Sequence, residues 1–430
     1  MLQLIFKNLW NMRGRYAWLF LELIIITGIT WFIIDRTVVS LSDKYLPLGY
    51  DSGRLVRVAI GTLPTDHPGY AQTDSATNAD NAYSLIAKLR RIEGVEYASG
   101  NSDYINSTNS INTGYKTDSP SDSIPKSVMA FEYVPGQEFF ETYGIQVVDG
   151  SHSAEELSAR QPPLGKNEII ITESYAKRMW HDGKAVGRKL KAPHSDDDDV
   201  STVVAVVTDL RAKSYYRSKD LVFRPKATFI KNSFEVIVRL KPGTDQAKWA
   251  RELRSRYSDL RTGNFYVMSS TPFDNLIERT EYFQGITAER NANFILVGFF
   301  LINLILGVTG SFYLQTRRRI EEMGIHRSFG ARRGNITGIL IGEGLALTTV
   351  ACIAGNLLYL QYALKFGLST GYSSSYNNTP DGSWVSNFGE HFAIISIIIY
   401  ILLIICVLIG TYMPARSISR INPVDALRDE

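Results

Sequence analysis

The sequence predicts an α-helical membrane protein with four spans and a large α+β extracytoplasmic domain, made of two subdomains, inserted between spans 1 and 2. Three observations support this fold class. Four segments are apolar over the roughly 20 residues that a helix needs to cross a bilayer. A long, mostly polar stretch, residues 35–292, separates the first segment from the other three. Lys and Arg gather next to alternate ends of the segments, which gives them an orientation.

The composition by itself does not reveal this organisation. The chain has 430 residues, 45% of them hydrophobic and 21% charged, and a formal net charge of +3. Its mean hydropathy of -0.07 is typical of a soluble protein. These values exclude a disordered chain, a collagen-like repeat and a disulfide scaffold. A net charge this small also gives nucleic-acid binding no electrostatic support, so we expect lipid and protein partners and no nucleic acid.

The first predicted span, residues 16–34, admits two interpretations. The basic residues Lys7, Arg13 and Arg15 precede it, as in a cleavable signal peptide. However, the apolar run is longer than the about 7–15 residues of a signal peptide, and Asp35-Arg36 follows where small residues would be expected. We therefore predict an uncleaved anchor. The remaining spans are predicted at 294–314, 336–362 and 392–413, and their length argues against core helices of a soluble protein.

Flanking charge predicts the orientation of the spans. The amphipathic N-terminus 1–15, the loop 315–335 and the tail 414–430 together hold twelve Lys and Arg against five Asp and Glu. In the loop 363–391, Lys365 is the only Lys or Arg. Because positive residues are retained in the cytoplasm, both termini are predicted inside, with 35–292 and 363–391 outside.

The outer domain is predicted to contain two similar strand-loop-helix units. Residues 54–63 and 234–240 alternate polar and apolar side chains, and apolar residues at helical spacing follow each of them. A more β-rich insert, residues 135–226, lies between these units. We therefore divide the domain into an outer subdomain, 50–134 and 227–285, and this inserted subdomain.

Polar stretches and cysteines complete the prediction for this domain. Residues 65–78 and 100–126 are rich in Ser, Thr, Asn and Asp and predict surface loops. The acidic run 195–199 lacks the spacing of an EF-hand loop and predicts a solvated hairpin tip. Cys352 and Cys406 both fall within spans, so the outer domain must be stabilised by its own core without disulfides.

The sequence contains no recognisable catalytic constellation. It has no G-x-S-x-G, H-E-x-x-H or C-x-x-C motif, no phosphate-binding loop, and no two histidines four residues apart. We therefore predict no catalytic, cofactor-binding or metal-binding residue, and expect that the chain by itself is not an enzyme. A triad assembled from distant positions remains an alternative.

The loop after the second span, RRRIEEMGIHRSFGARRGNI (317–336), is the most informative segment. Acidic residues come early and arginines late, which matches the dipole of a short helix. Composition therefore predicts a helix at the inner membrane surface. The alternative, a loop whose arginines serve only to orient the spans by the positive-inside rule, explains the arginines equally well. An apolar contact face is predicted from Ile320, Met323 and Phe329.

Several segments resemble the MacB-like and FtsX-like ABC transporter permease family. EMGIHRSFGA (322–331) resembles the E-I-G-I-R-R-A-x-G-A signature after the second span, and PARSISRINPVDALRDE (414–430) resembles the family's ending. NEIIITESYAKRMW, AVGRKL and VVAVVTDL (within 167–210) are similar to the MacB-type periplasmic core. The departures are His326, Ser328 and Ala205, where the family usually has Arg, Ala and Gly. Glu343 in GEGLAL matches an acidic position of span three.

The resemblance implies a set of partners and a location. Segment 317–331 would be the coupling helix that docks on an ABC ATPase, with Glu322, Gly324 and Arg327 as contacts and Gly330 as its end. No ATPase precedes the first span, so we expect it as a separate chain that carries ATP and Mg, with no cofactor in this chain. The resemblance also implies a homodimer in the inner membrane, a periplasmic large domain, and the option of a periplasmic adaptor and an outer-membrane channel.

Three functions follow as hypotheses. In the first, ATP hydrolysis moves the periplasmic domain by mechanotransmission and extrudes a substrate from the periplasm or outer leaflet. In the second, the same architecture is an FtsX-like regulator that activates an envelope enzyme or transmits a signal. The third, a receptor without an ATPase, leaves the inner signature unexplained. Substrate identity is not readable from the sequence.

The spans themselves hold two kinds of candidate residue. Gly338, Gly342 and Ala346 recur every four positions, an arrangement that lets helices approach closely either within the chain or at a dimer seam. Glu22 and Glu343 each lie roughly 10 Å inside the predicted inner end of a span. Intramembrane acids are functional candidates, although snorkelling or pairing with an inner arginine is an alternative.

Overall fold

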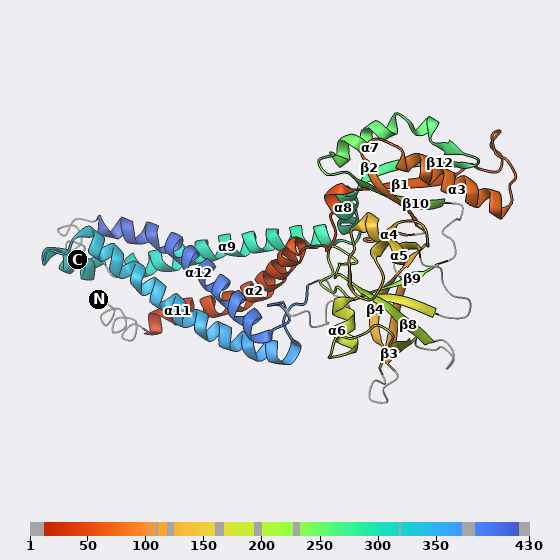
Figure 1. Ribbon diagram of the computed structural model, residues 1–430. Coiled ribbons are helices and arrows are strands. Elements are labelled where there is room, and N and C mark those ends of the chain that lie inside the picture. The colour runs from red at the N-terminus through yellow and green to blue at the C-terminus, as the bar shows by residue number, and fades with distance from the viewer. Residues whose placement is uncertain are drawn as a thin grey trace. The chain divides into compact units, whose positions relative to one another are not determined.

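The computed structural model describes residues 13–101, 103–107, 111–117, 124–159, 167–192, 200–226, 233–317, 320–371 and 383–420. It divides into two compact units (Figure 1). The first, which we call the membrane unit, contains the described residues up to Ser42, those between Ala288 and Gly371, and those from 383 onward. The second, Asp43–Thr287, we call the large domain.

Four long helices of the membrane unit are apolar enough to cross a bilayer, which confirms the four predicted spans. All extend beyond the predicted ranges, because the apolar segments mark only the part suited to hydrocarbon while the backbone remains helical beyond it. A shorter helix, α10, follows the second of them. The helices are α2 (Arg13–Tyr45), α9 (Ile286–Arg317), α10 (Ile320–Ser328), α11 (Arg333–Phe366) and α12 (Phe388–Ser419).

Trp31 of α2 is the largest fully buried side chain of the membrane unit among the described residues. Its ring stacks on Tyr359 of α11, with centroids 4.3 Å apart, and on Phe392 of α12 at 5.1 Å. Its indole Nε1 donates a hydrogen bond to Asn356 Oδ1 at 2.8 Å. One residue thus fixes α2 against two other spans through both stacking and a satisfied polar group.

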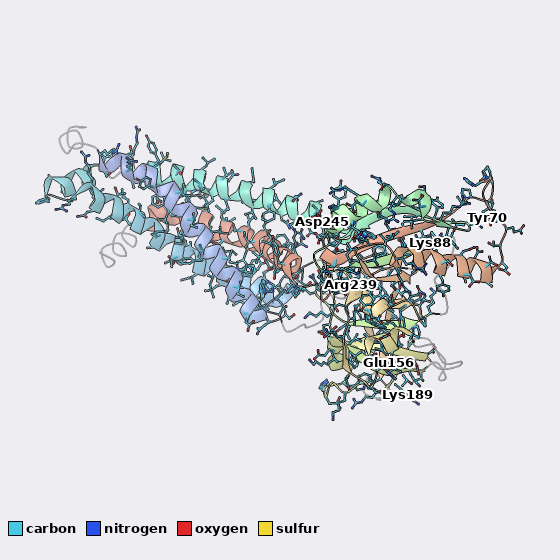
Figure 2. The ribbon with its side chains drawn as sticks, turned by 45° about the horizontal axis from the view of Figure 1, so that its top comes forward. Tyr70, Lys88, Glu156, Lys189, Arg239 and Asp245 are labelled. Atoms are coloured by element: carbon cyan, nitrogen blue, oxygen red, sulfur yellow. The ribbon has the colours of Figure 1, made fainter. Side chains whose placement is uncertain are left out.

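The large domain contains a five-stranded antiparallel sheet in the order β11-β12-β1-β10-β2. Apolar residues of α3 (Ser75–Arg90) and α7 (Gln246–Arg254) share one buried cluster with its strands. Asp245, labelled in Figure 2, caps α7 by accepting hydrogen bonds from the backbone N–H groups of Ala247 and Lys248. The strands are β1 (Leu55–Thr62), β2 (Val95–Asn101), β10 (Ser233–Leu240), β11 (Arg261–Thr262) and β12 (Phe265–Pro272).

A seven-stranded mixed sheet forms the rest of the large domain, in the order β5-β8-β6-β9-β4-β3-β7. An additional pairing of β7 with β8 closes six of the strands into a ring, and β5 pairs with β8 outside that ring. Closure removes two exposed strand edges. The strands are β3 (Ile111–Thr117), β4 (Lys126–Tyr133), β5 (Val147–Asp149), β6 (Asn167–Thr172), β7 (Lys189–Lys191), β8 (Val200–Val207) and β9 (Leu221–Pro225).

The boundary between the two subdomains differs from the predicted one at 134/135. Strands β3 and β4 belong to the seven-stranded sheet, so 111–133 are part of the insert rather than of the outer subdomain. The predicted loop 100–126 likewise contains β3, and α3 already begins at Ser75, within the predicted loop 65–78. A polar strand such as β3 lacks the alternation of polar and apolar residues by which strands are recognised in a sequence. It forms because it pairs with neighbouring strands in the tertiary structure.

Short helices and 3-10 turns complete the large domain. The aromatic residues of α4 pack with both sheets in one buried cluster that includes Phe223 of β9 and Ile237 of β10. The subdomains therefore share a core. The elements are η1 (Ser52–Arg54), α4 (Phe139–Tyr143), α5 (Ala154–Ala159), α6 (Glu173–Met179), η2 (Tyr257–Asp259) and α8 (Phe273–Phe283).

Candidate functional site: the junction loop and the inner helix

The connection from β8 to β9, residues 208–220, is an almost entirely buried loop that we call the junction loop. Arg211 lies at its centre and is 1% exposed. Its backbone N–H donates to the carbonyl of Leu48 at 2.8 Å. Its guanidinium donates to four further main-chain carbonyls, those of Asp43, Leu46, Ser214 and Tyr216.

These bonds hold the segment 43–48, through which the chain enters the large domain. A second cation acts at the same place, because Arg217 Nε lies 3.1 Å from Asp43 Oδ1, and both side chains are at most 5% exposed. Burial lowers the pKa of Arg211, while the carboxylate of Asp43 acts in the opposite direction. Five donor contacts from one arginine satisfy carbonyls that would otherwise be buried without partners. The end of α2 is thus fixed in the domain by charge-assisted hydrogen bonds.

The same loop also binds α8, the last helix before the chain leaves the large domain. Ser214 Oγ donates to Glu281 Oε1 at 2.9 Å, and Ser214 N donates to Asn106 Oδ1 at 3.0 Å. Asn106 in turn accepts a hydrogen bond from Thr280 Oγ1 of α8 through its carbonyl, at 3.4 Å. The junction loop therefore contacts both the entering segment 43–48 and the departing helix.

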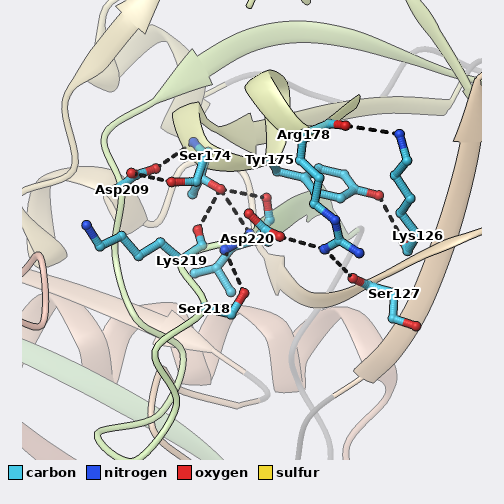
Figure 3. A network of polar contacts seen from close by, with 11 residues as sticks. Lys126, Ser127, Ser174, Tyr175, Arg178, Asp209, Ser218, Lys219 and Asp220 are labelled. Carbon is cyan, nitrogen blue, oxygen red and sulfur yellow. Dashed lines mark hydrogen bonds and ion pairs between the residues drawn. The ribbon is translucent and has the colours of Figure 1, made fainter. Parts of the chain in front are cut away.

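Both ends of the junction loop are fastened to α6, as Figure 3 shows. Ser174 donates twice to Asp209, from N to Oδ1 at 2.8 Å and from Oγ to Oδ2 at 2.5 Å. At the other end Arg178 Nη1 lies 2.6 Å from Asp220 Oδ2. Burial raises the pKa of Asp220, and Arg178 partly offsets that effect. The seven-stranded subdomain is thereby linked through one loop to both chain connections.

Lys213 is the unusual cation of the loop. Its side chain is 2% exposed, and burial lowers its pKa to about 8, with the carboxyl of Asp103 acting in the opposite direction. Burial also raises the pKa of Asp103. Lys213 therefore carries a desolvation cost at neutral pH, as Arg211 does.

Sequence reasoning did not identify the junction loop as a site. Its sequence TDLRAKSYYRSKD (208–220) contains many polar residues and resembles a solvent-exposed connection. The only signal was the motif VVAVVTDL, which ends in the loop with Asp209 and Leu210. Burial of this polar segment depends on carbonyls that lie far away in the sequence, at 43–48, and cannot be read from local composition.

Helix α10 lies within the segment 317–336 for which a short helix was predicted, and Gly330, with φ +87°, follows its end at Ser328. Ile320 packs against an apolar cluster formed by Ile336 and Leu340 of α11 and Ala415 and Ile418 of α12. The predicted apolar face is therefore divided, because Ile320 points into the membrane unit whereas Phe329 is 88% exposed. Met323 belongs to the side chains that the structure does not describe.

The predicted ATPase contacts occupy different environments on α10 and in the turn that follows it. Gly324 is buried, Glu322 is partly buried, and Gly330 is exposed. The side chain of Arg327 lies outside the described set. Ile325 is 48% exposed and lies four residues from Phe329, so α10 and the turn after it present an exposed apolar pair. The role of these residues in binding an ATPase stays a prediction.

The candidate small-residue face packs little within the chain. Gly338 is exposed, and Gly342 and Ala346 are only partly buried. Close helix contacts are made instead by Gly344 and Gly355: a Cβ at Gly355 would lie 2.7 Å from Thr27 Cβ of α2, and one at Gly344 3.0 Å from the ring of Phe312. The spacing of small residues alone did not show which face contacts another helix.

The two intramembrane acids also differ. Glu343 is 1% exposed within α11. Glu22 is partly buried and lies against α9, with Oε1 2.5 Å from the position of a Cβ at Gly307. Among the described residues, no group of three or more His, Cys, Asp and Glu could hold a metal ion. The acidic run 195–199 lies outside those residues.

Comparison with known families assigns both units. The model of the MacB-like periplasmic core domain matches residues 23–256, and that of the FtsX-like permease C-terminal domain matches residues 294–423. The first includes most of the large domain with the junction loop, and the second includes α10.

Curated relatives agree with this assignment. The chain is 21% identical over 305 residues to the macrolide export ATP-binding/permease protein MacB of Chromobacterium violaceum, covering 69% of this chain and 42% of that protein. It is 23% identical over 308 residues to MacB 1 of Yersinia pestis bv. Antiqua, covering 68% and 42%. The chain thus spans less than half the length of these relatives.

Two solved structures have similar chains. One is the periplasmic region of MacB from Actinobacillus actinomycetemcomitans, with 13% identity, coverage of 54% of this chain and 94% of that one, and a TM-score of 0.29. The other is the extracellular domain of the ABC-type transporter YknZ from Gram-positive bacteria, with 16% identity, coverage of 50% and 100%, and a TM-score of 0.27. Because the core-domain model alone matches more than half of the chain, the chain belongs to the MacB-like and FtsX-like permease family.

Proposed function

We propose that the chain is the permease subunit of a MacB-like ABC transporter, in which ATP hydrolysis by a separate cytoplasmic ATPase moves the large domain. Permeases of this family typically work with ABC ATPase partners. The names of the curated relatives combine ATP binding, a permease and macrolide export. For this chain we propose, in addition, that the mechanism is mechanotransmission and that a substrate is extruded from the periplasm or the outer leaflet. The proposed working form is a homodimer.

The junction loop is the observation that carries the mechanical part of this proposal. Helix α2 is continuous from Arg13 to Tyr45, and its last residues are held by Arg211 and Arg217. Helix α8, which precedes α9, is held by the same loop through Glu281. Within the large domain, displacement of the end of α2 or of α8 would therefore be passed to the seven-stranded subdomain through the contacts of the junction loop with α6.

The inner helix supports the partner part of the proposal. Ile320 ties α10 to the ends of α11 and α12, so a force on α10 reaches two spans directly. Ile325 and Phe329 are exposed, and exposed apolar side chains of this size are typical anchors of a protein interface. Arg332 and Arg333, which follow α10 and are exposed, provide polar groups at the rim of such an interface.

The first test is ATPase binding by the full chain in mild detergent. Replacing Glu322 and Arg327 together with Gln should abolish co-purification of the ABC ATPase and stimulation of its hydrolysis, while membrane insertion is retained. The matched control replaces Glu252 and Arg254 of α7, which are exposed on the large domain, with Gln. Unchanged binding and stimulation in the first variant would contradict the coupling assignment.

A second test separates transport from regulation. Substrate efflux that requires the permease should disappear when the ATPase is inactivated by a substitution that preserves its assembly with the chain. Loss of an envelope enzyme's activity with no change in efflux would favour the FtsX-like regulator instead. The orientation is tested by reporters: one fused after Glu430 should behave as cytoplasmic and one at Ser375 as external.

A further inference from the structure

The membrane unit carries an apolar groove of about 760 Å³ between α2, α9 and α11. Six lining residues come from α2 between Ile24 and Ile33, two from α9 and four from α11 between Gly355 and Tyr362. Every lining residue is aliphatic, aromatic or glycine. The volume is that of a ligand-binding cleft.

The length of the groove matches one leaflet of a bilayer. Ile24 and Ile33 are nine residues apart on α2, which at about 1.5 Å per residue gives roughly 13 Å. Half of the hydrocarbon core measures about 15 Å. Gly28 faces open space in this groove, since a Cβ there would meet no atom within 4 Å. An acyl chain lying along the helices would therefore fit within its length.

Two cations stand at one end of this groove. Arg36 places its guanidinium carbon 5.3 Å from the ring centroid of Phe32, which lines the groove. Lys365 places Nζ 5.3 Å from the ring of Phe366, and that ring lies 4.8 Å from the ring of Tyr362, another lining residue. Each cation thus continues an aromatic wall of the groove.

Arg36 and Lys365 belong to the same end of the groove. Asp35, the neighbour of Arg36, accepts a hydrogen bond from Ser369 N, four residues after Lys365, at 2.9 Å. Asp35 itself is engaged with His391, whose Nε2 lies 2.6 Å from Asp35 Oδ1. Within the part of the chain that the structure describes, neither Arg36 nor Lys365 has an acidic partner, and both are exposed.

We propose that this groove binds an anionic phospholipid from the leaflet on the side of the large domain. Its acyl chain would lie between α2, α9 and α11, and its phosphate would be held by Arg36 and Lys365. Long cationic side chains at the end of a span extend toward the headgroup region, and arginine suits the bidentate recognition of phosphate. An apolar groove with two exposed cations at one end complements an amphiphile that has one negatively charged headgroup. This inference does not depend on the proposed transport activity.

The test uses the full chain in nanodiscs made of equal parts phosphatidylglycerol and phosphatidylcholine. The photoreactive residue benzoylphenylalanine replaces Ile29, which lines the groove, or Ile397 of α12, which is exposed and does not line it. After irradiation, mass spectrometry identifies the adducts. The phosphatidylglycerol share of the adducts should be at least about fivefold higher at position 29 than at position 397.

Two sets of variants separate the head from the chain. The double variant R36Q/K365Q should reduce the phosphatidylglycerol enrichment at position 29 to the value at position 397. The control is Arg416→Gln, because Arg416 also lies over an aromatic ring, that of Tyr412, but does not belong to the groove, and it should leave the enrichment unchanged. Gly28→Leu should reduce all lipid adducts at position 29 by filling the groove. Gly310→Leu, at another open helical glycine outside the groove, should not.

Three results would overturn the proposal. Equal lipid composition at positions 29 and 397 would show ordinary bilayer contact. Adducts with a second copy of the chain at position 29 would show that a protein interface covers the groove. Enrichment in the wild type that is insensitive to raising NaCl from 0.1 to 1 M would contradict headgroup recognition by charge, because high salt screens exposed ions.

Discussion

The junction loop and the segment around α10 are both rich in basic residues, but those residues are buried in the junction loop and exposed beside α10. Arg211, Lys213 and Arg217 are each at most 3% exposed, and Arg211 is surrounded by carbonyls of its own chain. Arg332 and Arg333, which follow α10, are exposed. A buried cation that donates to carbonyls of its own chain fixes the position of those segments. An exposed cation beside a pair of exposed apolar side chains is available to bind a partner. The two regions therefore suggest a fixed transmission element and a docking element.

Arg211→Met should have the largest effect on stability. It leaves four buried carbonyls without a donor, so the free energy of unfolding should fall by about 3–5 kcal/mol. Denaturant unfolding of the full chain in mild detergent measures this. Arg254→Met, at the exposed end of α7, is the control and should change it by less than about 0.5 kcal/mol. Equal values for the two variants would remove the distinction between the regions.

Lys213 provides a test through pH. Its pKa in the folded chain is about 8, below the 10.5 of an unperturbed lysine, so between these values the unfolded chain binds more protons. Stability should therefore rise with pH from about 8 to 10.5, by up to about 1.4 kcal/mol per pH unit, and the desolvation cost should be fully present below pH 8.

Lys213→Met should remove this rise and stabilise the domain near pH 7. The measurement is unfolding of both proteins across the pH range, with Lys248→Met on the exposed face of α7 as the control. Parallel curves for wild type and Lys213→Met would mean that this lysine is not desolvated.

Phe329→Ser should affect partner binding instead of stability. Because Phe329 is 88% exposed, its removal should leave unfolding unchanged but weaken binding of the ABC ATPase about tenfold, roughly 1.4 kcal/mol. Titration of the ATPase onto the chain in nanodiscs measures the affinity. Phe283→Ser, an exposed phenylalanine of α8, serves as the control for loss of apolar surface. A destabilised protein with normal affinity would reverse the roles assigned to the two regions.

Ser174→Ala should give the smallest effect. It removes one hydrogen bond to the carboxylate of Asp209 while the backbone donor remains, so the loss should be about 1 kcal/mol. Ser258→Ala removes a hydroxyl hydrogen bond to Asp259 at an exposed site and should cost almost nothing. Comparison of the two unfolding curves isolates the contribution of burial. Identical losses would indicate that the attachment of the junction loop to α6 is not special.

The spans and the strands with clear alternation were predictable because their signals are local. Four apolar segments sufficed to locate α2, α9, α11 and α12, and alternation located β1 and β10. The subdomain boundary failed at β3 and β4 for the opposite reason: β3, with the sequence INTGYKT, is a strand because it pairs with β4 and β7. Likewise, Gly355 and Gly338 are both small residues on one helix, and only the position of α2 distinguishes them.

Sequence alone determined that this chain has four spans and a large domain between the first two, because hydropathy and its periodicity are properties of consecutive residues. It also indicated the family, through the order of its motifs. Tertiary structure alone decided that the polar segment 208–220 is buried, because its donors bind carbonyls at 43–48 and Glu281 of α8, and its carboxylates accept from residues of α6. It likewise decided which residues line the groove. Such properties depend on distant segments meeting in space, which no local pattern records.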